Sequence, residues 1–354
     1  MACSFSACWP SSLLLLFLPH KQWYIRIWDY PRLQTFSIVI PGILWYLFFY
    51  FKRGLRGHVF VAMFAIVIIV QAYKAWPYTF LGHKQVLQSE GSAAGTTTVS
   101  MIICNVLQPN TSYCKVLALV KEKDPDIFIT TESDSIWQHN LKNIEGSFPF
   151  RVAVPQGNTY GMHLYSKLAL YSTQVRYLLE NGIPSIKTKV QLKSREWITL
   201  FVLHPRPPVP TAASDSRERD AEIIMVAKET RKQKDGVIVE GDFNDAAWSK
   251  TAELFQEVSG LLDPRRGRGF YNTFHAKIPF FRWPLDHVFH SSYFKLASMT
   301  SAKKIDSDHF TMYIVLSYEP EEKLDQPKVK PDANTEKDAN KTIKKGFKDG
   351  DAPG

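Results

Sequence analysis

Val237–Asn244 reads Val-Ile-Val-Glu-Gly-Asp-Phe-Asn, and this stretch decides how the rest of the chain is interpreted. Its β-branched start predicts a buried strand, which Gly241 ends where the backbone must turn tightly. Asp242 and Asn244 follow two positions apart, so both side chains leave an extended backbone on the same side. Such a pair suits a catalytic base or metal ligand beside a group that holds a phosphate oxygen. Ordinary turn chemistry also favours Gly-Asp-x-Asn, so the other motifs must decide.

The chain has 354 residues, which allows two or more domains, or one large domain with extensions. Its formal net charge of +9 favours anionic partners such as nucleic acid, nucleotides or anionic lipid, with mere solubility as the alternative. Cysteines stand at only four positions, without zinc-site spacing: Cys3, Cys8, Cys104 and Cys114. We expect Cys104 and Cys114 to be separate buried thiols, since they could pair only in an oxidising compartment.

Residues 1–80 are predicted to be a membrane region with two or three transmembrane helices. Phe36–Phe51 and Val59–Tyr73 are apolar runs without charge, joined by a short basic turn. Each is slightly shorter than the roughly 20 residues of a typical spanning helix, and Pro41 interrupts the first. Neither run has a polar face, which favours a membrane hairpin over a buried soluble one. Leu13–Leu18 is either the end of a further spanning helix or a signal-like region.

Membrane sidedness follows from the basic turn between the two runs. The positive-inside rule places this turn, with Lys52, Arg53 and Arg56, in the cytoplasm. Both ends of the hairpin, and everything after Tyr78, would then lie outside the cytoplasm. Basic residues in the preceding segment weaken the bias.

The rest of the chain divides into a linker at residues 81–98, a soluble domain at 99–318 and a polar tail at 319–354. Apolar alternation predicts most of the domain's strands: Val99–Cys104, Ile127–Thr131, Gly161–Tyr165, Lys187–Leu192, Trp197–Leu203, Leu285–Phe289 and Phe310–Ser317. Helical spacing is found at Arg217–Lys232 and Ala252–Val258. The tail has too few large apolar side chains to order itself, so we expect a disordered, solvated extension.

Eight polar residues stand where an apolar strand starts or stops: Asn105, Glu132, His204, Asp242, Asn244, Asp286, Asp308 and His309. Strand ends of one sheet meet at one edge, so this group can converge on one cleft. Glu132 and Asp308 would be hard oxygen ligands for Mg²⁺. His309 suits proton transfer, and Asp286 could fix its tautomer. Each residue alone has a structural explanation, but the repeated placement favours a functional site.

From Val99 to about Tyr318 the sequence resembles the endonuclease/exonuclease/phosphatase superfamily, which has the DNase I-like fold. The matching motifs occur in family order: Asn105, Glu132, His204, Gly241-Asp242-Phe243-Asn244, Leu285-Asp286-His287 and Ser307-Asp308-His309. The resemblance implies an α+β fold, a four-layer sandwich of two mixed β-sheets flanked by helices, here preceded by transmembrane helices. It also implies hydrolysis of a phosphate ester with Mg²⁺, or with Mn²⁺ or Ca²⁺ as alternatives.

The resemblance assigns a role to each matching position. Glu132 would bind the metal, helped by Asn105 and Asp308. Asp242 would activate or orient the attacking water, and Asn244 would hold the phosphate. This is metal-assisted in-line attack, with donors and cations aimed at developing negative charge.

The two histidines would complete the site. His309, paired with Asp286, would be the general base or a phosphate contact, and His204 would stabilise the transition state. The general-base role stays divided between this paired histidine and the aspartate of the Gly-Asp-Phe-Asn motif. Nuclease members can give the position of His204 an acidic partner from an earlier strand. Here no acid is available, and Tyr160 or His163 is the candidate.

The hairpin and Arg282–His287 together resemble a bacterial subgroup with an N-terminal membrane region. This implies a multi-pass protein of the bacterial inner (plasma) membrane with a periplasmic, extracytoplasmic catalytic domain. The leading hypothesis is a membrane-anchored phosphodiesterase acting on nucleic acid. Its basic groove would come from four cations before Asp286: Arg265, Arg266, Arg268 and Lys277. The alternatives are a hydrolase of phospholipid or small phosphorylated substrates, and an inactive membrane-tethered module. No obligate protein partner is evident.

Overall fold

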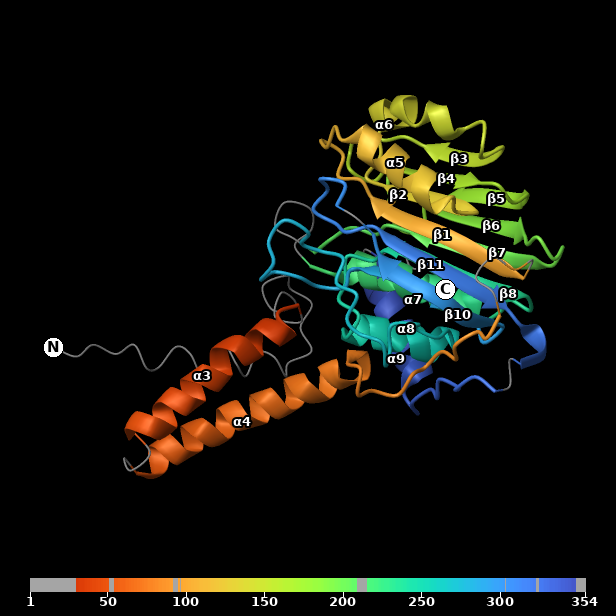
Figure 1. The fold of residues 1–354 in the computed structure, drawn as a ribbon. Coiled ribbons are helices and arrows are strands. Elements are labelled where there is room, and N and C mark those ends of the chain that lie inside the picture. Colours follow the sequence, from red (N-terminus) through yellow and green to blue (C-terminus); the bar gives the residue numbers. More distant parts are fainter. Residues whose placement is uncertain are drawn as a thin grey trace.

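The computed structural model describes residues 30–50, 54–91, 95, 97–208, 215–302, 304–322 and 325–347. Two β-sheets pack face to face with helices on their outer sides, and two long helices project away from this sandwich (Figure 1). The predicted Leu13–Leu18 segment, Cys3, Cys8 and the basic pair Lys52-Arg53 lie outside the described residues.

Both sheets are mixed, as predicted. The first has the order β10-β11-β1-β2-β4-β3 and the second the order β5-β6-β7-β8-β9. The first contains β1 Thr98–Asn105, β2 Ile127–Thr131, β3 Phe150–Val154, β4 Met162–Ser166, β10 Phe294–Ser301 and β11 Met312–Tyr318. The second contains β5 Leu170–Arg176, β6 Ser185–Gln191, β7 Trp197–Leu203, β8 Gly236–Asp242 and β9 Asp286–His290. Only β1–β2 and β7–β8 pair in parallel among these strands.

Strand alternation separates the core into layers. On β8, Ile238 faces the other sheet, whereas Val237 and Val239 face the outer helices. Helices α7 Arg217–Thr230 and α8 Lys250–Ser259 cover this sheet. Helices α5 Tyr113–Lys123 and α6 Ser135–Asn140 cover the other, over buried Ile102 and Phe128. The result is the predicted α+β sandwich of two sheets flanked by helices.

Gly241 shapes the edge of the second sheet. Its φ is 136°, and a Cβ there would lie 2.0 Å from the carbonyl oxygen of Leu203, its register partner on β7. Only glycine accommodates both the conformation and the close approach. The turn therefore follows from the sequence, and it directs Asp242 toward the first sheet.

The N-terminal hairpin consists of α3 Arg32–Tyr50 and α4 Leu55–Ala75, which run side by side (Figure 1). Two windows here are long and apolar enough to cross a membrane: Arg32–Phe49, within α3, and Gly57–Tyr78, which covers most of α4 and continues past its end. Only 17% and 18% of these windows are buried inside the protein, so they are not core helices of the domain. The two apolar runs predicted as a helical hairpin thus form one.

The prediction of a disordered tail is wrong for Thr335–Gly346, which forms helix α9 and packs against α7 and α8. Ala339 and Ile343 join the core cluster beneath these helices. Gly346 completes the stripe, because a Cβ there would lie 2.2 Å from the Cβ of Ala221. A narrow stripe of Ala339, Ile343 and Gly346 at helical spacing is enough when the opposing helices offer a matching groove.

The structure also describes part of the predicted linker and two of the cysteines. The segment before the domain packs along β10: Val86 is buried, and Gln88 forms a bridge with Leu296. Cys104 and Cys114 are separate free thiols, as expected, but only Cys104 is buried. Cys114 is exposed because it lies on the outer surface of α5.

Candidate active site

The predicted site residues gather at the edge where β1, β2, β7 and β8 end and β9 begins. Asn105 connects the two sheets there. Its Nδ2 donates to Glu132 Oε1 at 2.9 Å and to Asp242 Oδ2 at 3.1 Å, and its Oδ1 accepts from the Leu107 amide at 3.0 Å. Residues from β1, the β2 end and β8 are therefore held in one hydrogen-bonded group.

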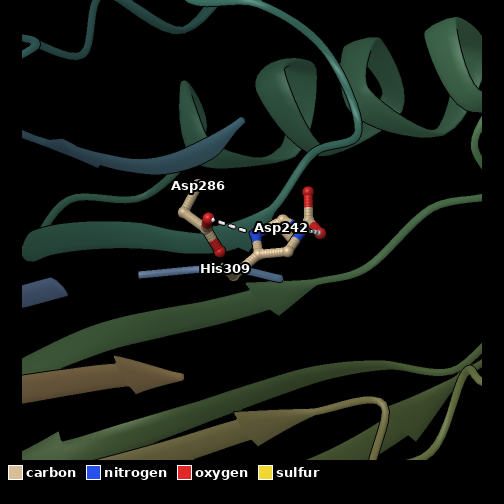
Figure 2. Close-up of side chains that lie close together, drawn as sticks. All are labelled: Asp242, Asp286 and His309. Carbon is tan, nitrogen blue, oxygen red and sulfur yellow. Dashed lines mark hydrogen bonds and ion pairs between the residues drawn. The ribbon is translucent and has the colours of Figure 1, made fainter. Parts of the chain in front are cut away.

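His309 lies between two aspartates, as Figure 2 shows. Its Nδ1 donates to Asp286 Oδ2 at 2.8 Å, and its Nε2 lies 3.5 Å from Asp242 Oδ2. Burial alone would lower the pKa of His309, but the charges of Asp286 and Asp242 raise it to about 10. Conversely, burial would raise the pKa of Asp286, and the charge of His309 brings it below its usual value. The His309–Asp286 pairing predicted from sequence is thus present as an ion pair.

Asp242 is the shared neighbour of both histidines. Its Oδ1 accepts from the Asn244 amide at 2.8 Å, and its Oδ2 lies 3.9 Å from His204 Nε2. Burial raises the pKa of Asp242 to about 7, against the opposing charge of His309. Burial lowers the pKa of His204 to about 4, and the charge of His309 lowers it further, so His204 is neutral at pH 7.

The structure places one of the two candidate neighbours beside the ring of His204. The Tyr160 ring lies 5.6 Å from the His204 ring. His163 instead makes a 2.6 Å hydrogen bond between its Nδ1 and Ser133 Oγ. Tyr160 is therefore the ring beside His204, and His163 is occupied elsewhere.

Asn244 differs from its expected role in one respect. Its Nδ2 donates to the Pro205 carbonyl at 3.0 Å, so part of the side chain is already engaged. Its backbone carbonyl accepts from Tyr30 Oη at 2.8 Å and from Arg219 Nη1 at 2.5 Å. Sequence reasoning missed both supports, since Tyr30 precedes the hairpin and Arg219 was one polar residue in an amphipathic helix.

The expected basic groove is contradicted at its first three positions. Arg265 is buried, pairs with Asp263 at 2.7 Å and donates to the Asp286 carbonyl at 3.0 Å. Arg266 lies over the Tyr78 ring, and Arg268 donates to the Val86 carbonyl at 2.6 Å. These guanidinium groups hold loops in place because buried carbonyls and a carboxylate supply their partners. Of the four cations, only Lys277 is exposed.

Acidic side chains outnumber cationic ones at this edge. Its four carboxylates, on Glu132, Asp242, Asp286 and Asp308, face one cationic imidazolium. Within the described residues no lysine or arginine forms an ion pair with any of them. Burial raises the pKa of Glu132, although the Asn105 hydrogen bond opposes this rise. Carboxylate and amide oxygens are the ligands that Mg²⁺ prefers, so a divalent cation fits this donor set.

One group of side chains in the described part of the chain has the geometry to hold such an ion. Asp242, Asp286 and His309 each bring a potential ligand atom within 4.8 Å of one another, close enough to hold a metal. The His309 Nδ1 donates to Asp286, so only its Nε2 could ligate the ion, and the raised pKa of His309 means that this nitrogen would first have to lose its proton. The set predicted from sequence, Asn105, Glu132 and Asp308, offers oxygen donors only, but the Asn105 Oδ1 already accepts from the Leu107 amide and the Asn105 Nδ2 points at Glu132.

Residues 102–309 match the model of the Endonuclease/Exonuclease/phosphatase family. The chain belongs to this family. Endonuclease/exonuclease/phosphatase proteins are metal-dependent enzymes that hydrolyse phosphate ester bonds, and this protein is such an enzyme. The sequence-based assignment to the superfamily is confirmed. No curated protein matches the sequence.

Solved structures with the same fold are distant in sequence. A D. rerio TDP2 complexed with single-strand DNA product is 15% identical, with a TM-score of 0.53, covering 62% of this chain and 99% of its own. The human Nocturnin catalytic domain with bound sulfate is 15% identical, with a TM-score of 0.51 and coverage of 63% and 95%. An endonuclease/exonuclease/phosphatase from Bacteroides vulgatus is 16% identical, with a TM-score of 0.52 and coverage of 63% and 100%. These likenesses concern the fold.

Proposed function

We propose that the protein is a membrane-anchored, Mg²⁺-dependent phosphodiesterase that acts on nucleic acid by in-line attack of water. The observation that carries this proposal is the two-sided edge. Glu132 and Asn105 lie on one side, the His309–Asp286 pair lies on the other, and Asp242 lies between them. A phosphate placed over Asp242 would meet metal ligands and proton donors from opposite sides.

The side chains divide the work as follows. Asn105, Glu132 and Asp308 hold the metal, which supplies positive charge to the phosphate oxygens when bound. Asp242 orients the attacking water, since it is the carboxylate that both histidines approach.

The histidines and Asn244 act on the phosphate. His309 donates from Nε2 to a phosphate oxygen, and Asp286 keeps Nδ1 engaged so that the ring cannot turn. His204 contributes a second donor to the transition state. Asn244 holds a phosphate oxygen through the part of its side chain that Pro205 leaves unbound.

Nucleic acid is supported by the surroundings of the edge. Arg282 and Lys304 lie over the Phe310 ring, beside His309, and Lys277 is exposed nearby. Cations interleaved with aromatic rings suit a strand whose phosphates and bases are bound together. The D. rerio TDP2 structure, which has the same fold, contains a DNA product.

Membrane anchoring is supported by the hairpin. Its two candidate spans are apolar and mostly unburied by the protein, and Tyr73 and Trp76 are exposed at the domain end of α4, as suits a membrane interface. The basic loop between the helices would lie in the cytoplasm and the catalytic domain in the periplasm of a bacterial inner membrane. A reporter fused after Tyr318 tests this sidedness, and reporter activity confined to the cytoplasm would reverse it.

Phospholipid is the second candidate substrate, because the hairpin joins the domain at the catalytic edge. Tyr30, just before α3, donates to the Asn244 carbonyl, and Tyr78, just after α4, donates to the Ala247 carbonyl at 2.6 Å. Both contacts lie in the loop that follows Asp242. A hairpin inserted in a bilayer would therefore hold the site near the headgroups.

The proposal is tested by hydrolysis assays on the full-length protein in lipid nanodiscs with Mg²⁺. Single- and double-stranded DNA, RNA, phospholipid and a phosphomonoester are compared side by side. Glu132→Ala and His309→Ala serve as inactive controls. Cleavage of nucleic acid that both variants lose supports the nuclease proposal. Activity confined to lipid supports the second candidate, and a folded protein that cleaves nothing contradicts both.

A further inference from the structure

Exposed apolar side chains surround the place where the hairpin meets the domain. Phe80 and Leu81, just after α4, are 83% and 75% exposed. Ile278, Phe280 and Phe281 lie in the loop before β9 and are 44%, 49% and 46% exposed. We call these five residues the apolar collar. Large apolar groups gathered at one junction on a protein surface mark an interaction site.

The collar is continuous with the two ends of the hairpin. Gln34, in the first turn of α3, donates from Nε2 to the Phe280 carbonyl at 2.5 Å. The candidate span of α3 begins at Arg32, so this contact fixes the loop at the depth where the span starts. On the other side, Phe80 lies two residues after Tyr78, where the second candidate span ends. Both parts of the collar therefore lie at the level where a bilayer surface would meet the hairpin.

Cationic side chains beside the collar also fit a membrane interface. Lys277 is exposed next to Ile278, and Arg282 follows Phe281 directly. Aromatic side chains flanked by cations suit a membrane interface, where rings enter the acyl boundary and cations meet anionic headgroups. A protein partner would need a complementary apolar surface, whereas a bilayer next to the hairpin is already supplied by the proposed anchor.

A series of rings connects the collar to the site. Phe281 lies 5.9 Å from Trp283, Trp283 stacks with Phe274 at 5.8 Å, and Phe274 lies 5.1 Å from the His309 ring. The backbone follows the same route, because the Ala276 amide donates to the Asp308 carbonyl at 2.6 Å. The collar loop thus packs directly on the segment that carries the catalytic histidine.

We propose that the apolar collar enters the bilayer surface beside the hairpin and holds the catalytic edge at headgroup level. This inference rests on the membrane anchoring in the proposed function. The occupant of the collar is the lipid bilayer itself. The site would then act on phosphodiesters lying at the membrane surface, whether lipid headgroups or nucleic acid brought to the membrane.

The test places a fluorophore at the collar of the full-length chain. Cys3, Cys8 and Cys114 are changed to serine, and Phe280→Cys is labelled with an environment-sensitive dye. Tyr171→Cys is the matched control, because Tyr171 is an exposed aromatic on β5, away from the hairpin. Both proteins are reconstituted in vesicles of phosphatidylcholine and phosphatidylglycerol, with or without doxyl groups on the lipid. Doxyl lipid is expected to quench the dye at position 280 by roughly twofold or more and to leave position 171 unchanged.

Each outcome has a distinct meaning. Quenching at 280 but not at 171 supports the inference. Equal fluorescence at both positions, in protein that floats with the vesicles, overturns the inference and leaves the anchoring intact. Protein that does not float overturns the anchoring and the inference together. Hydrolysis measured on the same samples reports separately on the proposed activity, since quenching does not require catalysis.

Discussion

The catalytic edge and the helical hairpin place opposite kinds of side chain in unusual surroundings. The edge buries charged groups, and each relies on a few particular partners, such as His309 on Asp286. The hairpin exposes large apolar groups, such as Phe48 and Ile69, which are 83% and 65% exposed. Single substitutions at the edge should therefore cause large losses of activity or stability. The stability of the hairpin should depend mainly on whether lipid or water surrounds it. Single contacts between the two regions should give smaller effects than those at the edge.

The largest effect is expected at the ion pair of the edge. Asp286→Asn removes the charge that keeps His309 protonated and leaves the ring free to turn. We predict a loss of kcat of about 10²- to 10⁴-fold with a smaller change in KM, measured with a soluble phosphodiester. Asp332→Asn, at an exposed carboxylate in the tail, is the matched control. An Asp286→Asn variant with normal kcat would show that the pair is only structural.

The second-largest effect is expected at Glu240, which lies on the same strand as Asp242 but has no hydrogen-bond partner among the described residues. Glu240 lies two residues before Asp242 and between Val202 and Val288 in register, and neither of its oxygens has a hydrogen-bond partner in the structure. Burial raises the pKa of Glu240 to about 8. The protonated side chain of Glu240 makes its full contribution to the free energy of unfolding below the unfolded-state pKa of about 4.3. This contribution is lost as the pH rises through the folded-state pKa of about 8.

Glu240→Gln should therefore remove this part of the pH dependence. The variant should be more stable than the parent at pH 9, by on the order of 4 kcal/mol, and the difference should shrink toward pH 5. Urea unfolding of both proteins in detergent at several pH values measures it. Parallel stability curves across this range would mean that Glu240 is not a buried neutral acid.

The backbone turn of the edge should be nearly as sensitive. Gly241→Ala brings a Cβ against the Leu203 carbonyl in a conformation that alanine rarely adopts. We predict destabilisation of about 3 kcal/mol or more, seen as a lower unfolding midpoint. Gly146→Ala is the control, since nothing lies within 4 Å of a Cβ there. Equal midpoints for the two variants would contradict the close approach.

The smallest effect is expected at the junction of the two regions. Tyr30→Phe removes the hydroxyl that donates to the Asn244 carbonyl, while Arg219 remains in place. One hydrogen bond of about 1 kcal/mol corresponds to a loss of roughly fivefold in kcat/KM. Tyr171→Phe, on the outer face of β5, should change nothing. Unaltered activity in Tyr30→Phe would mean that this contact of the hairpin does not support the site.

Much of the fold and site could be predicted because the signals are local. The strand that ends at Asp242 is marked by β-branched residues and by a glycine that only a tight turn requires. Strand-end polar residues such as Asn105 and Glu132 converge because sheet topology brings strand ends together. The apolar hairpin likewise needs no distant partner to be identified.

The remainder depends on contacts between distant parts of the chain. Arg265 has the same local appearance as a surface arginine, and only the folded loop reveals Asp263 and the Asp286 carbonyl as its partners. Helix α9 is mostly polar, and its few apolar side chains are recognisable only once α7 and α8 are in place against them. Tyr30 and Arg219 support Asn244 from elements far away in sequence. Sequence patterns do not encode such pairings.

The most direct test of the account is a Mg²⁺ titration of phosphodiester hydrolysis by the full-length protein. It compares the parent with Glu132→Gln and His309→Gln. If Glu132 holds the metal and His309 contacts the phosphate, Glu132→Gln raises the Mg²⁺ concentration for half-maximal activity by about tenfold or more. His309→Gln then lowers kcat without moving that concentration. A shift caused by His309→Gln instead would assign the metal to Asp242, Asp286 and His309 and contradict the two-sided site.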